Sequence, residues 1–174
     1  DDPGVHSSQN EQDNRLYGKF AMIPVVEPSD SQEAKDFVAV ALELSETFDT
    51  PVMLRTTTRI AHSQSMVQLG ERREIPLREY KKNIAKNVMV PAYARGRRLV
   101  MEERMAKLTE YAASTPLNRV EWGDRSFGII TSGICYQYVK DAFPQASILK
   151  LGLTFPLYLA LLVLWERDGV TVSE

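Results

Sequence analysis

Cysteine is almost absent from this chain of 174 residues, since Cys135 is the only one. A single thiol excludes an internal disulfide framework, and it excludes a cysteine-rich zinc site or an iron–sulfur cluster held by this chain alone. It also fits a reducing compartment, so we expect a cytoplasmic protein. Histidine is equally scarce, because His6 and His62 are the only two and they lack the spacing of a helical metal-ligand pair.

Long hydrophobic runs and a large excess of one charge are also missing. The most apolar stretch, 157–165, has about half the length that a membrane span needs, and no basic start precedes an apolar signal core. The 21 Lys and Arg residues nearly balance the 23 Asp and Glu residues, for a net charge of −2. We therefore expect no membrane insertion and no nucleic-acid partner.

Motifs that identify an enzyme by themselves are absent as well: there is no GxSxG elbow, no Walker loop and no GxGxxG. Cys135 stands where a helix is predicted to begin, which can activate a thiol. Its neighbours Ile134 and Tyr136 favour the alternative, a buried structural cysteine.

What is present indicates an α/β protein. The apolar run 22–27 predicts a buried strand, and Ser29 or Asp30 is placed to cap the helix that follows. Asp49-Thr50-Pro51 ends this helix, and a second strand is predicted from Val52 onward, running into 55–59. A strand, a helix and a strand form a βαβ unit, so we expect the two strands to be parallel.

A second βαβ unit is predicted near the other end of the chain. Its strands are expected at 127–131 and 147–151, with a helix to about 142 between them and a further short strand at 119–122. A helix or strand near 157–165 and a strand at 170–172 complete this prediction. The two units imply parts of two parallel-sheet domains.

The region between the units is basic. Residues 71–107 carry eleven Lys and Arg against five Asp and Glu, and Pro91 predicts the first turn of a long helix to about Ala113. We interpret 66–116 as a helical connector. Its charge is typical of a solvated face, and the alternative is a docking surface for an acidic partner or for an acidic part of the same molecule.

Two polar regions are candidates for binding a small anion. Residues 1–16 form a polar loop that includes His6, Asn10 and Arg15, and Arg59 and His62 follow the second predicted strand. An arginine can hold a carboxylate through two parallel hydrogen bonds, and ligands collect at the carboxyl ends of parallel strands. The alternative is a solvated loop beside a capped strand end.

Several long motifs in order carry a family resemblance. The runs DDPGVHSSQNEQDNR, IPVVEPSDSQEAKDFV and LSETFDTPVMLRTTTRIAHS, followed by VPAYARGRRLVMEERM, STPLNRVEWGD and GIITSGICYQYVKDAF, resemble the alpha subunit of indolepyruvate ferredoxin oxidoreductase. The resemblance extends from residue 1 to about 157, and the chain departs from the family pattern after Leu157. It marks the chain as similar to an internal piece of a longer 2-oxoacid:ferredoxin oxidoreductase subunit.

The resemblance implies three regions and a reaction. Residues 1–65 are expected to be the later part of a thiamine-diphosphate pyrimidine-type domain, 66–116 the connector, and 117–174 the start of a transketolase C-terminal-like domain. The complete enzyme is expected to decarboxylate aryl 2-oxo acids such as indolepyruvate oxidatively to acyl-CoA and to reduce ferredoxin. It is expected to use thiamine diphosphate, Mg²⁺ and 4Fe-4S clusters, with a beta subunit as partner.

The fragment alone is expected to bind none of these cofactors and to be inactive. Within the resemblance, Arg15 aligns with an arginine that related pyruvate enzymes use for the substrate carboxylate. Four further family-motif positions are expected to bind substrate, and the alternative is that they shape the loop: His6, Asn10, Arg59 and His62. The alternatives are a pyruvate or 2-oxoglutarate ferredoxin oxidoreductase subunit, and a non-catalytic α/β binding or assembly module.

Overall fold

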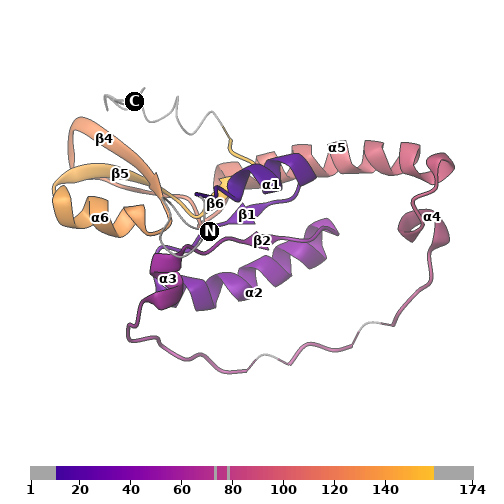
Figure 1. The fold of residues 1–174 in the computed structure, drawn as a ribbon, viewed down its shortest axis with the longest axis horizontal. Coiled ribbons are helices and arrows are strands. Elements are labelled where there is room, and N and C mark those ends of the chain that lie inside the picture. Colours follow the sequence, from indigo (N-terminus) through magenta and orange to yellow (C-terminus); the bar gives the residue numbers. More distant parts are fainter. Residues whose placement is uncertain (1–10, 73, 78, 159–174) are drawn as a thin grey trace.

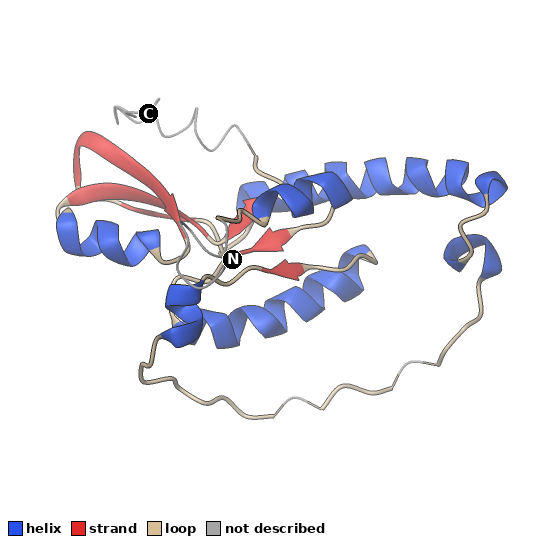
Figure 2. Ribbon diagram, viewed as in Figure 1, coloured by secondary structure: helices blue, strands red, loops and turns tan. Residues whose placement is uncertain are grey.

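The computed structural model describes residues 11–158 except 73 and 78, and these form two three-stranded sheets with helices against them (Figures 1 and 2). The strand order is β2-β1-β6 in the first sheet and β3-β5-β4 in the second. The α/β class predicted from the sequence is therefore confirmed. The strands predicted at 170–172 and most of the element at 157–165 lie outside the described residues.

The first βαβ unit consists of β1 (Val25–Val26), α2 (Ser31–Phe48) and β2 (Met53–Leu54). β1 and β2 are parallel, as predicted. The side chain of Asp30 accepts a hydrogen bond from the backbone N–H of Glu33 at 2.8 Å, which satisfies a donor that the helix start leaves open. α2 ends at Phe48, and the left-handed backbone of the next residue, Asp49 (φ 52°), closes its last turn.

Alternating side chains of β1 face two different partners. Val26 packs into a core cluster with Phe37 and Leu44 of α2 and with Leu153. Val25 points the other way, where Gly18 lies so close that an added Cβ would come within 2.1 Å of a Val25 methyl group. The period of two in a strand thus places α2 on one face of this sheet and α1 (Arg15–Ala21) on the other.

Two local predictions for this unit were wrong. The second strand ends at Leu54 and does not run into 55–59, because the hydroxyl of Thr57 caps a short helix, α3 (Thr58–His62). Helix α1 begins at Arg15, inside the stretch interpreted as a loop. Its large apolar side chains Leu16 and Phe20 are 66% and 90% exposed, so no buried periodic pattern marks it.

The second βαβ unit is confirmed in β4 (Asp124–Ser132), α6 (Cys135–Ala142) and β5 (Ala146–Leu151), with β4 and β5 parallel. The predicted short strand is β3 (Arg119–Glu121). It pairs antiparallel with β5, so this sheet is mixed and not wholly parallel.

The chain then returns to the first sheet. β6 (Leu153–Phe155) pairs antiparallel with β1, so this sheet is mixed as well. Asn118, just before β3, accepts hydrogen bonds from the backbone N–H groups of Gly152 and Leu153 at 3.0 and 2.9 Å. These contacts fix the point where the chain passes from the second sheet to the first. The division at 65 and 116 into domains stays a prediction.

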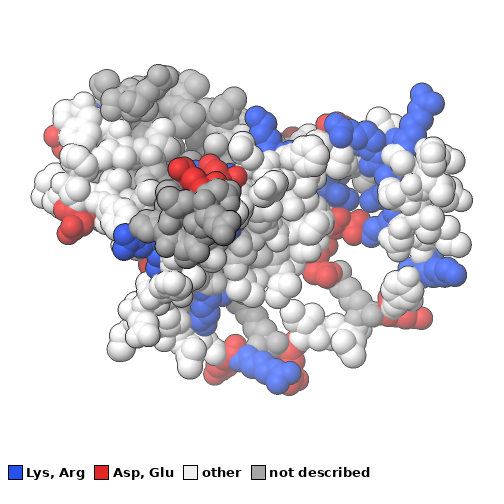
Figure 3. Space-filling view, viewed as in Figure 1, with Lys and Arg blue, Asp and Glu red and all other residues white. Residues whose placement is uncertain are grey.

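The connector contains α4 (Ile84–Asn87) and the predicted long helix, α5 (Pro91–Ser114). Before α4, the described residues among 63–83 form no helix or strand, and Figure 1 shows this segment arching away from the body. Part of the basic charge meets an acidic residue of the same molecule: Lys86, Arg97 and Arg104 lie 2.6, 3.9 and 3.8 Å from the Asp49 carboxylate. Other Lys and Arg side chains lie on the surface, as Figure 3 shows over the α4–α5 end. Among the described helices, none combines the length and the apolar character needed to cross a membrane.

Candidate functional site

The candidate site lies where β1 and β2 end. Glu27 follows β1 directly, and Arg55 follows β2. Because the strands are parallel, their carboxyl ends meet at one edge, and there Arg55 donates a hydrogen bond to Oε1 of Glu27 in an ion pair. The side chains are only 6% and 4% exposed, so this is a buried charge pair.

The carboxyl end of a third strand, β4, lies next to this ion pair. The turn between β4 and α6 brings Gly133 against Glu27, with a positive φ of 54°. A Cβ at this position would lie 2.5 Å from Oε1 of Glu27. Glycine is therefore required twice, by the left-handed backbone and by the close approach. The Thr131-Ser132-Gly133 turn is thus packed onto the carboxylate that follows β1.

The start of α1 supplies the exposed side of the cluster. Nε and Nη2 of Arg15 each donate a hydrogen bond of 2.8 Å to the carboxylate of Asp13. Oδ1 of the same carboxylate lies 3.9 Å from Nη2 of Arg55. The four side chains therefore alternate in charge, in the order Arg15, Asp13, Arg55 and Glu27, from the surface to the interior. We call these four residues the arginine–carboxylate cluster.

Burial and charge act in opposite directions on this cluster. Burial raises the pKa of Glu27, and the positive charge of Arg15 and a contact with Ser132 oppose the rise. The ion pair with Arg55 also favours the ionised carboxylate. Burial lowers the pKa of Arg55. At the surface, the hydrogen bonds from Arg15 hold the pKa of Asp13 below its usual value.

Within the described part of the chain, one carboxylate oxygen of the cluster has no hydrogen-bond partner. Oε2 of Glu27 is buried and has no hydrogen-bond partner among the described residues. Buried carboxylate oxygens are normally hydrogen-bonded, because leaving one unsatisfied costs about 1–3 kcal/mol or more. Such an atom at the converging ends of three strands can accept a hydrogen bond from a ligand or from another part of a larger protein.

The structure distributes the predicted binding residues unevenly. Arg15 is in the cluster, whereas Arg59 and His62 are exposed on α3, and no contact among the described residues joins them to it. His6 and Asn10 lie outside the described residues. Glu27 and Arg55, which the sequence reasoning missed, lie at the carboxyl ends of β1 and β2.

The signal for Glu27 and Arg55 was present in the sequence. Each is a charged residue directly after a short apolar strand, closer to the strand end than Arg59 or His62. The alternative of a buried structural cysteine was wrong for Cys135. It is exposed, because it is the first residue of α6 and the helix buries Tyr136 against Ala146 and Ile148 instead.

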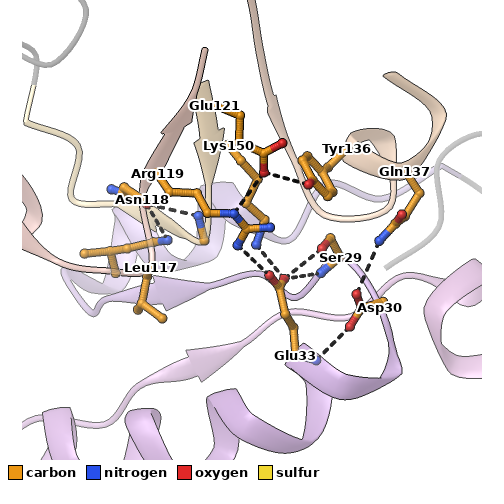
Figure 4. Close-up of polar contacts among 12 residues, drawn as sticks. Ser29, Asp30, Glu33, Leu117, Asn118, Arg119, Glu121, Tyr136, Gln137 and Lys150 are labelled. Atoms are coloured by element: carbon orange, nitrogen blue, oxygen red, sulfur yellow. Dashed lines mark hydrogen bonds and ion pairs between the residues drawn. The ribbon is translucent and has the colours of Figure 1, made fainter. Parts of the chain in front are cut away.

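A second polar cluster joins the two sheets (Figure 4). Lys150 of β5 is fully buried and donates a hydrogen bond to Glu33 of α2, which also accepts from the N–H and hydroxyl of Ser29, both at 2.8 Å. Arg119 of β3 reaches the other Glu33 oxygen at 3.0 Å. Burial alone would raise the pKa of Glu33, but Lys150, Ser29 and Arg119 hold it below its usual value.

This second cluster is satisfied internally. Arg119 also bonds Glu121, which accepts from the hydroxyl of Tyr136 at 2.7 Å and from Lys140 at 3.0 Å. These hydrogen bonds hold the pKa of Glu121 at about 2. Among the described residues, each charge of this cluster is paired with a neighbour on another element, so the cluster fastens α2 to the second sheet.

Neither cluster fits a metal ion. Within the part of the chain that the structure describes, no group of three His, Cys, Asp or Glu side chains could hold one. The arginine–carboxylate cluster brings together two carboxylates with two guanidinium groups, and such cations repel a metal. Its chemistry suits the binding of an anionic group.

Comparison with known proteins gives one consistent match. No protein-family model matches the chain. It is 42% identical over 163 residues to "Indolepyruvate oxidoreductase subunit IorA" of Archaeoglobus fulgidus, which covers 90% of this chain. The proteins of the same name from Methanothermobacter marburgensis and Pyrococcus horikoshii are each 44% identical and cover 100% and 93% of it.

These relatives are much longer than the chain. The chain spans 26%, 30% and 27% of their respective lengths. The resemblance predicted from the sequence motifs is therefore confirmed, and the matches cover 90–100% of the chain, so at least one of them extends past the predicted limit near Leu157.

Proposed function

We propose that this chain, as a segment of an indolepyruvate oxidoreductase subunit, takes part in the oxidative decarboxylation of aryl 2-oxo acids such as indolepyruvate. The identity of 42–44% over almost the full chain to proteins of that name supports the proposal most strongly. In the complete enzyme the products are an acyl-CoA and reduced ferredoxin, and the partner is a beta subunit.

The part that this segment plays is to bind the carboxylate of the substrate. The guanidinium of Arg15 is planar and already makes two parallel hydrogen bonds to a carboxylate, that of Asp13. Its side chain is 45% exposed, so a ligand can reach it from solvent. Behind it, Arg55 and Glu27 hold the site rigidly at the end of the first sheet. His6, Asn10, Arg59 and His62 remain proposed neighbours of the substrate.

The cofactors belong to other parts of the enzyme. Thiamine diphosphate with Mg²⁺ supplies the decarboxylation chemistry, and 4Fe-4S clusters carry the electrons. The described residues do not fit the metal or the clusters, since they contain one cysteine and no group of three metal ligands. We therefore place those sites in the more than two thirds of the subunit that this chain does not span, and we derive no step through them.

The test is turnover by the complete subunit, produced together with its beta subunit, with indolepyruvate, pyruvate and 2-oxoglutarate as competing substrates and ferredoxin reduction as the readout. The highest kcat/KM is expected for indolepyruvate. A preference for pyruvate or 2-oxoglutarate would identify the other branch of the enzyme class, and no turnover of any 2-oxo acid would indicate a non-catalytic module.

Arg15 is tested in the same assay. Replacing Arg15 by alanine is expected to raise KM for indolepyruvate by an amount equivalent to about 2–3 kcal/mol, because a charge-assisted bidentate contact is lost. The matched control is Arg98→Ala, which removes an exposed arginine that pairs with Glu102 on α5. An unchanged KM for the Arg15 variant would contradict its role as the carboxylate-binding residue.

A further inference from the structure

The arginine–carboxylate cluster already contains a bound carboxylate, that of Asp13. Arg15 meets it with two bonds of 2.8 Å in the fork geometry with which arginine binds carboxylate ligands. Arg55 lies 3.9 Å from it on the interior side. The Asp13 carboxylate thus sits between two guanidinium groups, where the carboxylate of a small ligand would experience the same contacts.

Charge balance shows what the site requires when Asp13 is absent from it. Arg55 is neutralised by Glu27, and both side chains are almost fully buried. Arg15 is then left with one positive charge, which a single monoanion would balance. In the structure this monoanion is the carboxylate of Asp13.

Asp13 is also the member of the cluster that is easiest to displace. It lies before α1, outside any helix or strand, and its side chain is 42% exposed. Glu27, by contrast, is fixed by Arg55 and by the close approach of Gly133. A rotation of the Asp13 side chain into solvent would free the Arg15 fork without disturbing the buried pair.

We propose that Asp13 is a built-in placeholder whose carboxylate occupies the position of the ligand carboxylate and is displaced when the ligand binds. The identity of the ligand, a 2-oxo acid, rests on the proposed function, whereas the displacement rests on the geometry of Arg15, Asp13 and Arg55. The placeholder lowers the apparent affinity, because a ligand must compete with a carboxylate that is always present.

The variant Asp13→Asn separates this proposal from a purely structural role. Asparagine keeps the side-chain oxygen that accepts the backbone N–H of Arg15 at 3.1 Å, and it removes the charge that binds the fork. If Asp13 is a placeholder, the Asp13→Asn variant should bind carboxylates more tightly than the unmodified protein does. If Asp13 instead holds Arg15 in its working position, the same variant should bind them more weakly, so the two roles predict opposite signs.

The experiment measures binding of indole-3-acetate, an aryl carboxylate without the reactive 2-oxo group, to the complete subunit in complex with its beta subunit by calorimetry. Asp13→Asn is expected to lower Kd about three- to tenfold, since the competing ion pair is exposed and weak. Arg15→Gln is expected to abolish binding, both alone and in combination with Asp13→Asn. Asp36→Asn, which removes an exposed carboxylate from α2, is the matched control and should leave Kd unchanged.

Turnover separates failure of this proposal from failure of the proposed function. With indolepyruvate, Asp13→Asn should lower KM and leave kcat within twofold. If no 2-oxo acid is turned over but Asp13→Asn still binds indole-3-acetate more tightly, the proposed function is wrong and the placeholder stands. If turnover is normal and Asp13→Asn leaves Kd unchanged or raises it, the placeholder is overturned. The placeholder is also overturned if neither the unmodified protein nor the Asp13→Asn variant binds indole-3-acetate.

Discussion

Replacing Glu33 by glutamine should destabilise the fold more than replacing its partner Lys150 by methionine. Lys150 is fully buried, so in Glu33→Gln its ammonium group loses the charge that compensates for burial. In Lys150→Met, Glu33 keeps Ser29 and Arg119. Methionine also preserves most of the apolar stem, and it removes the ammonium nitrogen, which lies 5.2 Å from the centre of the Phe37 ring.

The magnitudes follow from the surroundings of each partner. Removing one member of a buried ion pair costs about 3–5 kcal/mol, and we expect Glu33→Gln in that range. The unpaired Lys150 can lose its proton, and the free energy of that deprotonation sets an upper limit on the cost. For a lysine with an ordinary pKa of 10.5 at pH 7, at 1.36 kcal/mol per pKa unit, this limit is about 5 kcal/mol. For Lys150→Met we expect about 1–2 kcal/mol, because Glu33 stays hydrogen-bonded.

The pH dependence has a definite sign. Burial already lowers the pKa of Lys150, and the loss of Glu33 lowers it further. Between this lowered pKa and 10.5 the unfolded chain binds more protons than the folded one, so the stability of Glu33→Gln should rise with pH. The cost of the substitution should therefore shrink by about 1–2 kcal/mol between pH 7 and 9.

The assay is urea denaturation of the 174-residue chain followed by circular dichroism at pH 7 and 9, with both single variants and the double variant. The double variant should cost less than the two single variants combined, because the stranded charge is gone. An equal cost for the two single variants, or a Glu33→Gln cost that grows toward pH 9, would refute the assignment of Lys150 as a buried, Glu33-compensated cation.

Three further substitutions test local geometry by the same denaturation assay. Gly133→Ala should cost at least about 1–3 kcal/mol, because alanine is strained at φ 54° and its Cβ would lie 2.5 Å from Glu27; an equally stable variant would contradict the close approach. Gly96→Ala, with nothing within 4 Å of the added Cβ in α5, should instead stabilise by about 1 kcal/mol. Asp30→Ala should cost about 1 kcal/mol through loss of the α2 cap, whereas Asp30→Asn should cost little because asparagine also caps.

The elements that the sequence predicts well are those with strong local signals and a buried face. α2 has a capping aspartate, a clear apolar face and a left-handed residue at its end, and it was predicted almost to the residue. α5 has Pro91 in its first turn and was predicted equally well, although its Leu99 is 64% exposed. In both helices the sequence itself contains the start and stop signals.

The elements that were missed depend on contacts distant in sequence. β6 has only three residues, and its pairing with β1 joins positions 153–155 to 25–26. α1 exposes its apolar side chains and is fixed mainly through Gly18 against Val25, which no helical periodicity reveals. Short strands and exposed helices have too little local pattern to be distinguished from loops.

The two polar clusters show why the site was harder to predict than the fold. Sequence reasoning favoured arginine and histidine in polar stretches, and it passed over Glu27 and Arg55 because they flank apolar strands.

In the cluster around Lys150, each charge meets a partner on another element, and the result is attachment of two sheets. In the arginine–carboxylate cluster, a buried oxygen of Glu27 has no partner among the described residues, and the outermost carboxylate, Asp13, is half exposed and comes from a segment outside any helix or strand. A cluster built for stability alone gains from satisfying every atom, because each unsatisfied buried group costs free energy. An unsatisfied Glu27 oxygen and a displaceable Asp13 carboxylate at the converging strand ends distinguish the arginine–carboxylate cluster from the Lys150 cluster, and they are the reason for proposing that another molecule binds there.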